Sequence, residues 1–351
     1  MISTISIDGC SIGNSYPVFI IAELSANHLK SIEIAERTIR AMKNSGANAV
    51  KLQTYTPDTI TIDCDNECFQ MKQGTIWDGK TLYQLYQEAY TPWEWQPKLK
   101  KLAEELGLIC FSSPFDQSAV NYLESMDVPA YKVASFEITD IPLIEYIASK
   151  QKPIIISTGI ATLADIEEAL QACKRAGNDQ IAILKCTSAY PAPFEDANLR
   201  SIPDMASRFG TVVGLSDHTL GISVPLAGVA LGAKIIEKHF ILDRNLGGPD
   251  APFSLEPDEF KAMVTAVREV EKALGEVSYD LNERAKRSRE FSRSLFVIKD
   301  TKPGEILTHE NVRSIRPGYG LHPRHLKDAV GKKAKKAITR GTPLTWEHIK
   351  T

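Results

Sequence analysis

Short runs of apolar residues alternate with amphipathic segments over the first 280 residues of the chain. A short apolar run predicts a buried β-strand, and apolar positions three and four apart predict a helix. One predicted helix begins at Thr162, with Asp165 three residues later in the spacing of a capping box. The eight predicted strands are 18–23, 49–53, 108–113, 130–136, 153–157, 181–186, 211–216 and 234–239.

Eight consecutive strand–helix units predict a closed α/β barrel, the (β/α)8 or TIM barrel, which takes about 250 residues. A hairpin around Asp8-Gly9 is predicted before the first barrel strand. A doubly wound open sheet is the alternative, but no glycine-rich phosphate-binding turn follows the first strand. We therefore expect a barrel domain at 1–280, a linker at 281–292 and a small domain at 293–351.

The C-terminal part differs from the barrel in charge. From residue 281 onward there are 17 Lys and Arg against 7 Asp and Glu, whereas residues 1–280 have 24 against 37. A basic tail can bind nucleic acid, but this one has no recognisable motif and its charges are spread among Pro and Gly turns. Docking onto an acidic barrel or attraction of an anionic substrate is favoured, and no nucleic-acid partner is expected.

The chain shows no signal for a membrane or an export route. No apolar stretch approaches the roughly 20 residues of a membrane span, and the first residues lack a basic region with an apolar segment behind it. Of the six cysteines, Cys110 and Cys186 lie in strand-like runs, which suits reduced core thiols. Cys64 and Cys68 have no partner pair, so a zinc site or a disulfide is not favoured. We expect a cytoplasmic protein with no membrane partner.

Two strand ends carry the most informative chemistry: Ser-Asp-His from Ser216 to His218, and Glu-Lys-His from Glu237 to His239. Since alternate residues of a strand share a face, Ser216 lies with His218 and Glu237 lies with His239. If the strands are neighbours in a parallel barrel, two imidazoles and a carboxylate point into one mouth. They can then hold a divalent metal with coordination positions left open. For either histidine alone, the alternative is a packed core imidazole.

Nearly every other predicted strand also ends in polar residues. Lysines in a barrel mouth cost desolvation free energy unless an anion meets them, and lysines ringed by hydroxyl groups suit a phosphate or a carboxylate. For a single lysine the alternative is an exposed strand end. A metal and an anion in one pocket indicate a phosphorylated small molecule as the substrate. The candidates are Glu23, Lys51, Gln53, Ser113, Lys132, Ser135, Glu137, Ser157, Ser188, Tyr190 and, after the last strand, Asp250.

Six short motifs coincide with these strand ends: IAE with NH at 21–23 and 27–28, KLQTY at 51–55, FSSPFD at 111–116, KVAS at 132–135, GLSDHT at 214–219 and IEKHF at 236–240. Together they resemble the motifs of the sialic acid synthase family. Arg316-Pro317-Gly318 resembles the motif of that family's C-terminal antifreeze-like (SAF) domain. The likeness covers nearly the whole chain and implies a TIM barrel followed by a small SAF domain.

Enzymes of this family condense phosphoenolpyruvate with the open-chain aldehyde of an amino sugar and release phosphate. The resemblance implies that His218 and His239 hold a divalent metal, manganese or magnesium, which polarises the aldehyde oxygen. It also implies that Glu137 and Glu237 orient the water or the enolpyruvate carbons. The implied phosphoenolpyruvate contacts are Lys51, Ser113, Lys132, Ser135, Ser157 and Ser216. The implied sugar contacts are Glu23, Gln53, Tyr190 and Asp250, with Glu23 also a candidate for proton transfer.

The resemblance further implies a domain-swapped homodimer, in which the SAF domain of one subunit covers the barrel mouth of the other. Arg316 is then expected to bind an acetamido group of the sugar in the partner's barrel. Two positions depart from the family pattern. Ser188 stands where the family often has Asn, which affects its expected contact with phosphoenolpyruvate, and Ser113 replaces the usual Thr but keeps the hydroxyl group.

Within this family, residues 22–25 and 77–95 resemble the members that use a 6-deoxy sugar with two acetamido groups. This narrower resemblance favours such a sugar as the substrate. N-acetylmannosamine or the precursor of legionaminic acid is the alternative within the same class. A non-catalytic sugar-binding barrel protein and a metal-dependent aldolase that uses free pyruvate are alternatives from other classes.

Overall fold

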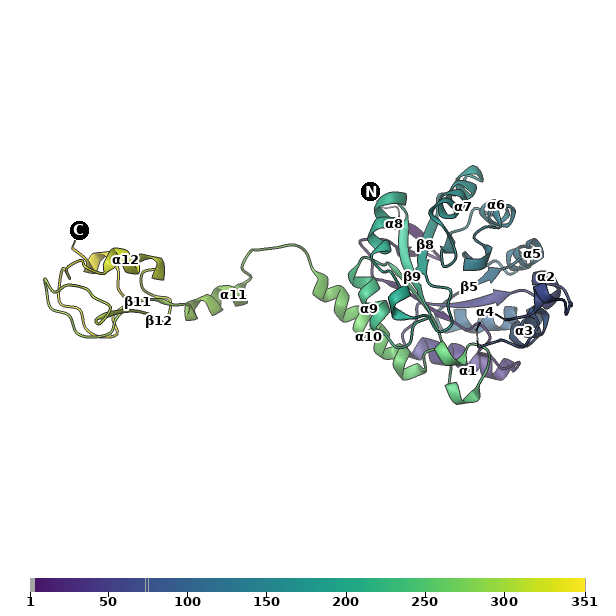
Figure 1. Cartoon of the computed structure of the whole chain (residues 1–351), viewed down its shortest axis with the longest axis horizontal. Helices are drawn as coiled ribbons and strands as arrows, with labels where there is room; N and C mark the ends of the chain where they lie inside the picture. Colours follow the sequence, from purple (N-terminus) through teal and green to yellow (C-terminus); the bar gives the residue numbers. More distant parts are fainter. Residues whose placement is uncertain (1–3, 73, 75, 351) are drawn as a thin grey trace. The chain divides into compact units, whose positions relative to one another are not determined.

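The computed structural model describes residues 4–72, 74 and 76–350 and divides the chain into two compact units. The first unit ends at Gly275 and the second begins at Glu276. Figure 1 labels several elements of each unit.

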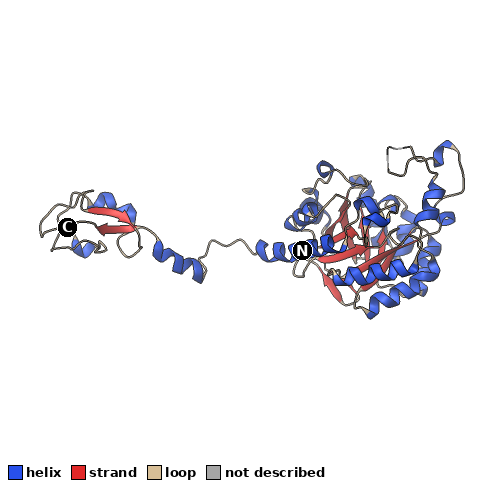
Figure 2. Ribbon diagram, turned by 90° about the horizontal axis from the view of Figure 1, so that it is seen from below, coloured by secondary structure: helices blue, strands red, loops and turns tan. Residues whose placement is uncertain are grey.

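The first unit is a closed barrel of parallel strands, as the sequence predicted. In the closed order β10-β3-β4-β5-β6-β7-β8-β9, each strand pairs with the next along the chain, and β10 pairs with β3. Figure 2 shows the strands in red with the helices in blue around them. The barrel strands are β3 (Phe19–Glu23), β4 (Ala49–Thr54), β5 (Ile109–Pro114), β6 (Tyr131–Val133), β7 (Ile154–Ser157), β8 (Ile181–Cys186), β9 (Val212–Asp217) and β10 (Ile235–His239).

The fourth barrel strand is shorter than its predicted range of 130–136. Strand β6 ends at Val133, and the chain turns into a 3-10 helix, η3 (Ser135–Glu137), where the amide of Glu137 donates to the carbonyl oxygen of Ala134. The apolar and aromatic run through Phe136 therefore misled the prediction, because Phe136 is exposed and not part of the sheet.

Helices follow the barrel strands and cover them from outside. The predicted capping box at the start of α7 is present, with Thr162 and Asp165 each accepting from the other's backbone amide. The α-helices are α1 (Ile32–Asn44), α2 (Pro57–Ile60), α3 (Leu82–Ala89), α4 (Gln96–Glu105), α5 (Gln117–Ser125), α6 (Ile141–Ala148), α7 (Leu163–Arg175), α8 (Ser201–Phe209), α9 (Ser223–Ala230) and α10 (Pro257–Leu274). The remaining 3-10 helices of this unit are η1 (Glu67–Phe69), η2 (Trp93–Trp95), η4 (Phe194–Asp196), η5 (Arg244–Leu246) and η6 (Ala251–Phe253).

Two apolar clusters make up the core of this unit. The larger lies between the strands and the helices. The smaller joins the starts of the barrel strands to the predicted hairpin, β1 (Ile5–Ile7) and β2 (Cys10–Ile12), which pairs antiparallel around Asp8 and Gly9. The hairpin therefore packs at the amino ends of the strands, and the carboxyl ends are left for the polar residues.

The second unit has its own small core. It contains α11 (Glu283–Ser288), η7 (Arg289–Phe291), β11 (Ser294–Val297), β12 (Val312–Ile315), η8 (Pro323–His325), α12 (Leu326–Ala329) and η9 (Trp346–His348). Strands β11 and β12 pair antiparallel, and apolar residues such as Leu295, Val297 and Leu307 form the core. In the part of the chain that the structure describes, no helix is long and apolar enough to cross a membrane.

A buried ion pair joins β9 to β10 on the helix side of the barrel. The Nζ of Lys238 contacts Oδ2 of Asp217 and the carbonyl oxygen of Thr219, and the side chains of Lys238 and Asp217 are almost completely buried. Removing one partner of such a pair leaves an uncompensated buried charge.

Asp217→Ala is therefore expected to lower the free energy of unfolding by about 3–5 kcal/mol, measured by urea denaturation. The matched control is Asp204→Ala, which breaks an exposed Asp204–Arg208 pair on α8 and is expected to cost less than about 1 kcal/mol. Equal losses for the two variants would contradict the role given to the buried pair.

Candidate active site

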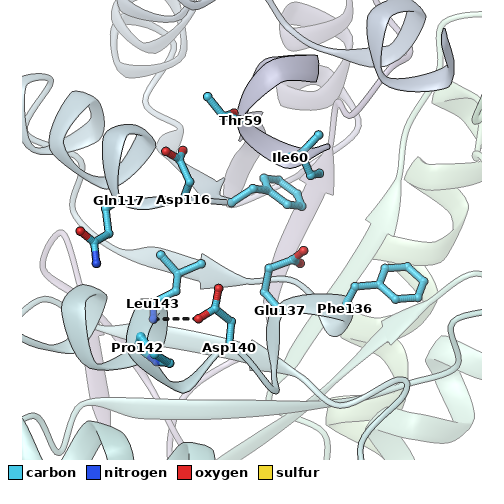
Figure 3. Close-up of a pocket in the computed structure, with 10 residues that line it drawn as sticks. Thr59, Ile60, Asp116, Gln117, Phe136, Glu137, Asp140, Pro142 and Leu143 are labelled. Carbon is cyan, nitrogen blue, oxygen red and sulfur yellow. Dashed lines mark hydrogen bonds between the residues drawn. The ribbon is translucent and has the colours of Figure 1, made fainter. Parts of the chain in front are cut away.

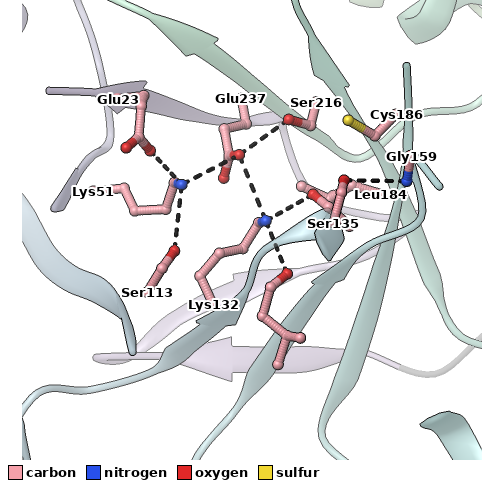
Figure 4. Close-up of polar contacts among 12 residues, drawn as sticks. Glu23, Lys51, Ser113, Lys132, Ser135, Gly159, Leu184, Cys186, Ser216 and Glu237 are labelled. Carbon is pink, nitrogen blue, oxygen red and sulfur yellow. Dashed lines mark hydrogen bonds and ion pairs between the residues drawn. The ribbon is translucent and has the colours of Figure 1, made fainter. Parts of the chain in front are cut away.

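The parallel strands bring most of the predicted site residues to one end of the barrel, since every carboxyl end lies there. A network of buried charges occupies this mouth (Figure 4). It is centred on Lys51 of β4 and Lys132 of β6, which lie on either side of Glu237 of β10. Fully buried lysines are rare unless they are paired.

Lys51 lies between two carboxylates. Its Nζ forms an ion pair with Glu23 of β3, lies 3.5 Å from Oε1 of Glu237 and donates to Oγ of Ser113 at 3.5 Å. Burial alone would lower the pKa of Lys51, but the two carboxylates raise it overall. The Nε2 of Gln53 donates to Oε1 of Glu23 at 3.2 Å, which adds a fifth side chain to this group.

Lys132 has a different set of partners. Its Nζ donates to Oγ of Ser157 at 2.7 Å and to the carbonyl oxygen of Val133 at 3.1 Å, and lies 3.7 Å from Oε1 of Glu237. Burial lowers the pKa of Lys132, and the nearby carboxylates offset this only in part. A cation with one distant carboxylate is well placed to receive an anion from outside.

The carboxyl groups of the mouth have opposite pKa shifts. Burial would raise the pKa of Glu237, but Lys132, Lys51 and the hydroxyl of Ser216, which donates at 3.1 Å, lower it overall. Burial raises the pKa of Glu23 to about 7 against the opposing effect of Lys51. Burial likewise raises the pKa of Glu137 to about 7. The site thus holds a carboxylate beside two groups that can exchange protons near neutral pH.

His218 and His239 lie side by side at the ends of β9 and β10, as predicted. Their ring centroids are 5.3 Å apart. The Nδ1 of His218 lies 3.0 Å from the carbonyl oxygen of Thr187, an arrangement that holds Nδ1 as the donor and leaves Nε2 for another partner. Burial lowers the pKa of His239 well below its ordinary value, so its imidazole is neutral.

These two imidazoles fit a metal ion in the chemistry of their donors. The Nδ1 of His239 is buried without a hydrogen-bond partner and lies 3.6 Å from Oδ2 of Asp250. Across residues 4–72, 74 and 76–350, however, no group of three or more His, Cys, Asp and Glu side chains is arranged to hold a metal. A metal bound here would therefore take two protein nitrogens and complete its coordination with water or substrate.

Hydroxyl groups and a thiol line the side of the mouth formed by β7 and β8. The amide of Gly159 donates to Oγ of Ser135 at 3.1 Å, and the Sγ of Cys186 lies 3.9 Å from Oγ of Ser188 and from Nδ1 of His218. A Cβ at Gly159 would lie 2.0 Å from Oγ of Ser188 and 2.8 Å from Oγ of Ser135, so a side chain there would displace these hydroxyl groups.

Sequence reasoning missed Gly159 and Cys186 as site residues. Burial would raise the pKa of Cys186, but His218, Ser135 and Lys132 bring it down to about 7. Cys186 ends a strand next to the predicted polar positions, and Gly159 follows Ser157 by two residues, but an apolar thiol and a lone glycine carry no distinct sequence signal.

An aromatic rim adjoins the histidines. The ring of Tyr190 lies 4.6 Å from His218, and Phe253 lies 5.0 Å from His239 and 5.2 Å from Tyr190. Phe253, from η6, is a second residue that the sequence did not single out. The amide of Ala26 donates to Oδ2 of Asp250 at 3.3 Å, and burial raises the pKa of Asp250.

A cavity of about 450 Å³ lies at the outer side of Glu137 (Figure 3). Its lining includes Ile60, Phe115 and the carboxyl groups of Asp116 and Asp140, which cap α5 and α6. Neither histidine belongs to this cavity, whose one predicted site residue is Glu137. We place the reaction centre at the charged network and the histidines, because the cavity lacks both a buried cation and an imidazole.

Arg316 is the one predicted site residue outside the first unit. It is exposed in the second unit and follows β12, before Pro317. The structure brings the following predicted residues to the barrel mouth: Glu23, Lys51, Gln53, Ser113, Lys132, Ser135, Glu137, Ser157, Ser188, Tyr190, Ser216, His218, Glu237, His239 and Asp250.

A closed parallel barrel with a charged pocket at the carboxyl ends of its strands is the architecture of a TIM-barrel enzyme. The chain matches the NeuB family model over residues 38–279 and the SAF domain model over residues 292–350. It therefore belongs to the NeuB family, and the resemblance to sialic acid synthases is confirmed.

Several proteins similar to this chain are named as acid synthases. It is 49% identical over 327 residues to a pseudaminic acid synthase of Campylobacter jejuni, covering 93% of this chain and 95% of the relative. It is 36% identical over 343 residues to an N,N'-diacetyllegionaminic acid synthase of Legionella pneumophila, with 96% of each covered. The crystal structure of an N-acetylneuraminic acid synthetase from Leptospira borgpetersenii, in complex with citrate, superposes with a TM-score of 0.73 at 32% identity, covering 82% of this chain and 95% of that one.

The raised pKa of Glu137 has a consequence for stability. In the unfolded chain this carboxyl loses its proton near its ordinary value of 4.5, whereas the folded protein keeps the proton to about pH 7. Between these values the folded state binds more protons, so the contribution of Glu137 to the free energy of unfolding falls as pH rises.

Glu137→Gln removes this dependence. The stability of the unsubstituted protein relative to the variant is expected to fall by on the order of 1–2 kcal/mol between pH 4.5 and 7.5, measured by urea denaturation. The exposed Glu168→Gln on α7 is the matched control and should show no such trend. A stability difference that is constant with pH would contradict the raised pKa.

Proposed function

We propose that this protein condenses phosphoenolpyruvate with 2,4-diacetamido-2,4,6-trideoxy-L-altrose, as a pseudaminic acid synthase. The products are a nine-carbon 2-keto acid and phosphate. The observation that carries the choice of sugar is the 49% identity to the Campylobacter enzyme, against 36% to the legionaminic acid synthase, over nearly the whole chain in both cases.

The charges of the mouth support phosphoenolpyruvate as one substrate. Lys51 and Lys132 lie on two strands with Glu237 between them, and they donate to the hydroxyl groups of Ser113 and Ser157, respectively. A phosphate and a carboxylate placed here would accept charge-assisted hydrogen bonds from both lysines. An anion also offsets the desolvation that lowers the pKa of Lys132.

His218 and His239 support a divalent metal, manganese or magnesium, at the sugar aldehyde. Such an ion, when bound, supplies Lewis-acid polarisation of the aldehyde oxygen. The protein's own part is to present two imidazoles side by side, of which that of His239 is neutral because burial lowers its pKa.

The reaction balances with the groups that the mouth contains. Carbon 3 of phosphoenolpyruvate forms a bond with the aldehyde carbon, and the aldehyde oxygen gains a proton to become a hydroxyl group. Water adds to the resulting cationic carbon 2 and loses a proton. The hydroxyl group so formed then becomes the keto group, giving its proton to the departing phosphate as the bond from carbon 2 to the phosphate oxygen breaks. Glu23, whose pKa of about 7 lets it give or take a proton at neutral pH, is the proposed proton carrier. Glu237 is the proposed carboxylate beside the cationic carbon, and the two lysines stabilise the departing phosphate.

Phosphate release from phosphoenolpyruvate tests the proposal. The sugars are 2,4-diacetamido-2,4,6-trideoxy-L-altrose, N-acetylmannosamine and the diacetamido-trideoxy-mannose precursor of legionaminic acid, each with manganese and after chelation. Release with the altrose sugar alone is expected, and chelation should lower the rate at least about 100-fold.

Each other outcome changes a different part of the proposal. Release with another sugar would keep the chemistry and replace the substrate. A full rate after complete chelation would overturn the proposal that a divalent metal is required. No release with any sugar would overturn the synthase and leave a sugar-binding barrel or an aldolase that uses free pyruvate, for which added pyruvate is the control.

We also propose that the active form is a cytoplasmic domain-swapped homodimer in which Arg316 of one subunit reaches the sugar in the other subunit's barrel. The opposite charges of the two parts of the chain support this, because residues 1–280 are acidic and the rest is basic. Exposure of Arg316 in the second unit leaves its guanidinium available to a ligand.

Mixing two inactive variants tests the shared site. Arg316→Ala and His239→Ala are each expected to lose at least about 100-fold in rate. In an equimolar mixture, half of the dimers combine the two variants and have one intact site, so about a quarter of the normal activity should return. Exposed His309→Ala is the control and should stay active. No recovery in mixtures that contain mixed dimers would show that Arg316 acts within its own chain.

A further inference from the structure

A segment that follows β4 reaches the opposite side of the barrel mouth. In the closed order of strands, β4 and β8 stand opposite each other. Trp77 belongs to the segment between β4 and α3, yet its ring lies 5.4 Å from the ring of Tyr190, which follows β8. Its Nε1–H donates to the carbonyl oxygen of Pro249, after β10, at 3.0 Å. One side chain therefore links three parts of the rim.

Trp77 adds a ring to the aromatic rim. Tyr190 contacts the ring of His218 on the one hand and the indole of Trp77 on the other, both at tilted angles. Phe253 is in contact with Tyr190 and His239. Such a surface of aromatic rings beside a few polar groups is typical of a small-molecule site.

The hydrogen bond of Trp77 also holds the loop that contains Asp250. Gly247 and Gly248 have φ values of 74° and 115°, a backbone conformation that favours glycine, and a Cβ at Gly248 would approach Leu29 to 3.0 Å. Pro249 follows directly and accepts from the indole. Asp250 then lies against His239 and the amide of Ala26. The hydrogen bond from Trp77 to Pro249 therefore holds the loop that contains Asp250, one of the proposed sugar contacts.

We propose that Trp77 determines sugar specificity by forming the wall that receives the apolar, 6-methyl end of the substrate. This inference rests on the proposed function, which places the sugar aldehyde at His218 and His239. Tyr190 contacts both His218 and Trp77, so with the aldehyde at the histidines we assign Trp77 to the end of the sugar remote from the aldehyde. A methyl group packs on an indole without loss, whereas a hydroxyl group at the same carbon loses hydration there.

The size of the effect follows from the chemistry of an apolar wall. Such a wall discriminates between substrates that differ by one small group by about 10- to 200-fold, and it rejects an added hydroxyl group by about 100-fold at most. Loss of the wall should therefore remove most of this preference without affecting phosphoenolpyruvate, which binds at Lys51 and Lys132 in the proposed function.

The test compares kcat and KM for phosphate release with 2,4-diacetamido-2,4,6-trideoxy-L-altrose and with its 6-hydroxy counterpart. Trp77→Ala is expected to raise the KM of the 6-deoxy sugar about 10-fold or more and to reduce the preference for it to less than about 3-fold. Trp77→Phe keeps an aromatic wall but loses the hydrogen bond to Pro249. It should raise the sugar KM less, by about 3-fold, and keep the preference.

Trp93→Phe is the matched control. Trp93 begins η2, after α3, and also donates its indole N–H to a carbonyl oxygen, that of Tyr55 at 3.1 Å, but its ring packs on Tyr122. The KM of the Trp93→Phe variant for the sugar should stay within about 2-fold of that of the unsubstituted enzyme. The KM of phosphoenolpyruvate should stay within the same range in all variants, and urea denaturation checks that each is folded.

The outcomes separate this inference from the proposed function. An unsubstituted enzyme that releases no phosphate with either sugar overturns the proposed function, and the inference with it. An active enzyme whose sugar KM and preference are unchanged in both Trp77 variants overturns the inference alone. An equal rise in the KM of the sugar and in that of phosphoenolpyruvate also overturns the inference, because general damage to the barrel mouth would raise both. If Trp77→Ala does not fold, an unchanged sugar KM in Trp77→Phe is sufficient to overturn it.

Discussion

The burial of two lysines in the mouth of the barrel is the constraint on which the rest of this site depends. Lys51 and Lys132 lie almost completely out of water, and both approach the same carboxyl oxygen of Glu237, at 3.5 and 3.7 Å. Charges in such surroundings have a high free energy unless they are paired and hydrogen-bonded. Glu23 supplies a second carboxylate to Lys51, but Lys132 has only hydroxyl and carbonyl oxygens besides Glu237. The site is therefore short of negative charge on one side, which is the basis for proposing an anionic substrate there.

The same constraint separates the roles of the carboxyl groups. Glu237 lies between the cations and has a lowered pKa, whereas burial raises the pKa values of Glu23 and Glu137 to about 7. A proposed reaction that moves one proton onto an oxygen and removes another from water needs both kinds of group. The barrel allows this because its apolar clusters and the amino-terminal hairpin fill the other end and the outside. Asp217 and Lys238 use the helix-facing positions of the same strands for a structural ion pair.

Predictions from the sequence succeeded where one local pattern carried the information. The apolar runs indicated all eight barrel strands. Alternation along each strand, with the two strands as barrel neighbours, predicted that His218 lies beside His239, and their ring centroids are 5.3 Å apart. The predictions failed where the position of a residue depends on a contact between segments that are distant in the sequence. The run through Phe136 leaves the sheet at Ser135, whose hydroxyl accepts from the amide of Gly159, and Gly159 itself stands out only because Ser135, Ser188 and Cys186 crowd around it. Phe253 contacts His239 from a 3-10 helix, η6, that the hydrophobic periodicity of the sequence did not predict.

The sequence by itself determined the fold class, the family and the kinds of groups at the strand ends, because hydrophobic period and short motifs are local properties. It also determined that the two parts of the chain have opposite charge. Only the tertiary structure decided that Glu237 is shared by two lysines, that His239 keeps a buried nitrogen without a hydrogen-bond partner, and that Trp77 from one side of the mouth meets Tyr190 from the other. These depend on how the barrel closes, since closure sets which strand ends face each other and how far each side chain is removed from water.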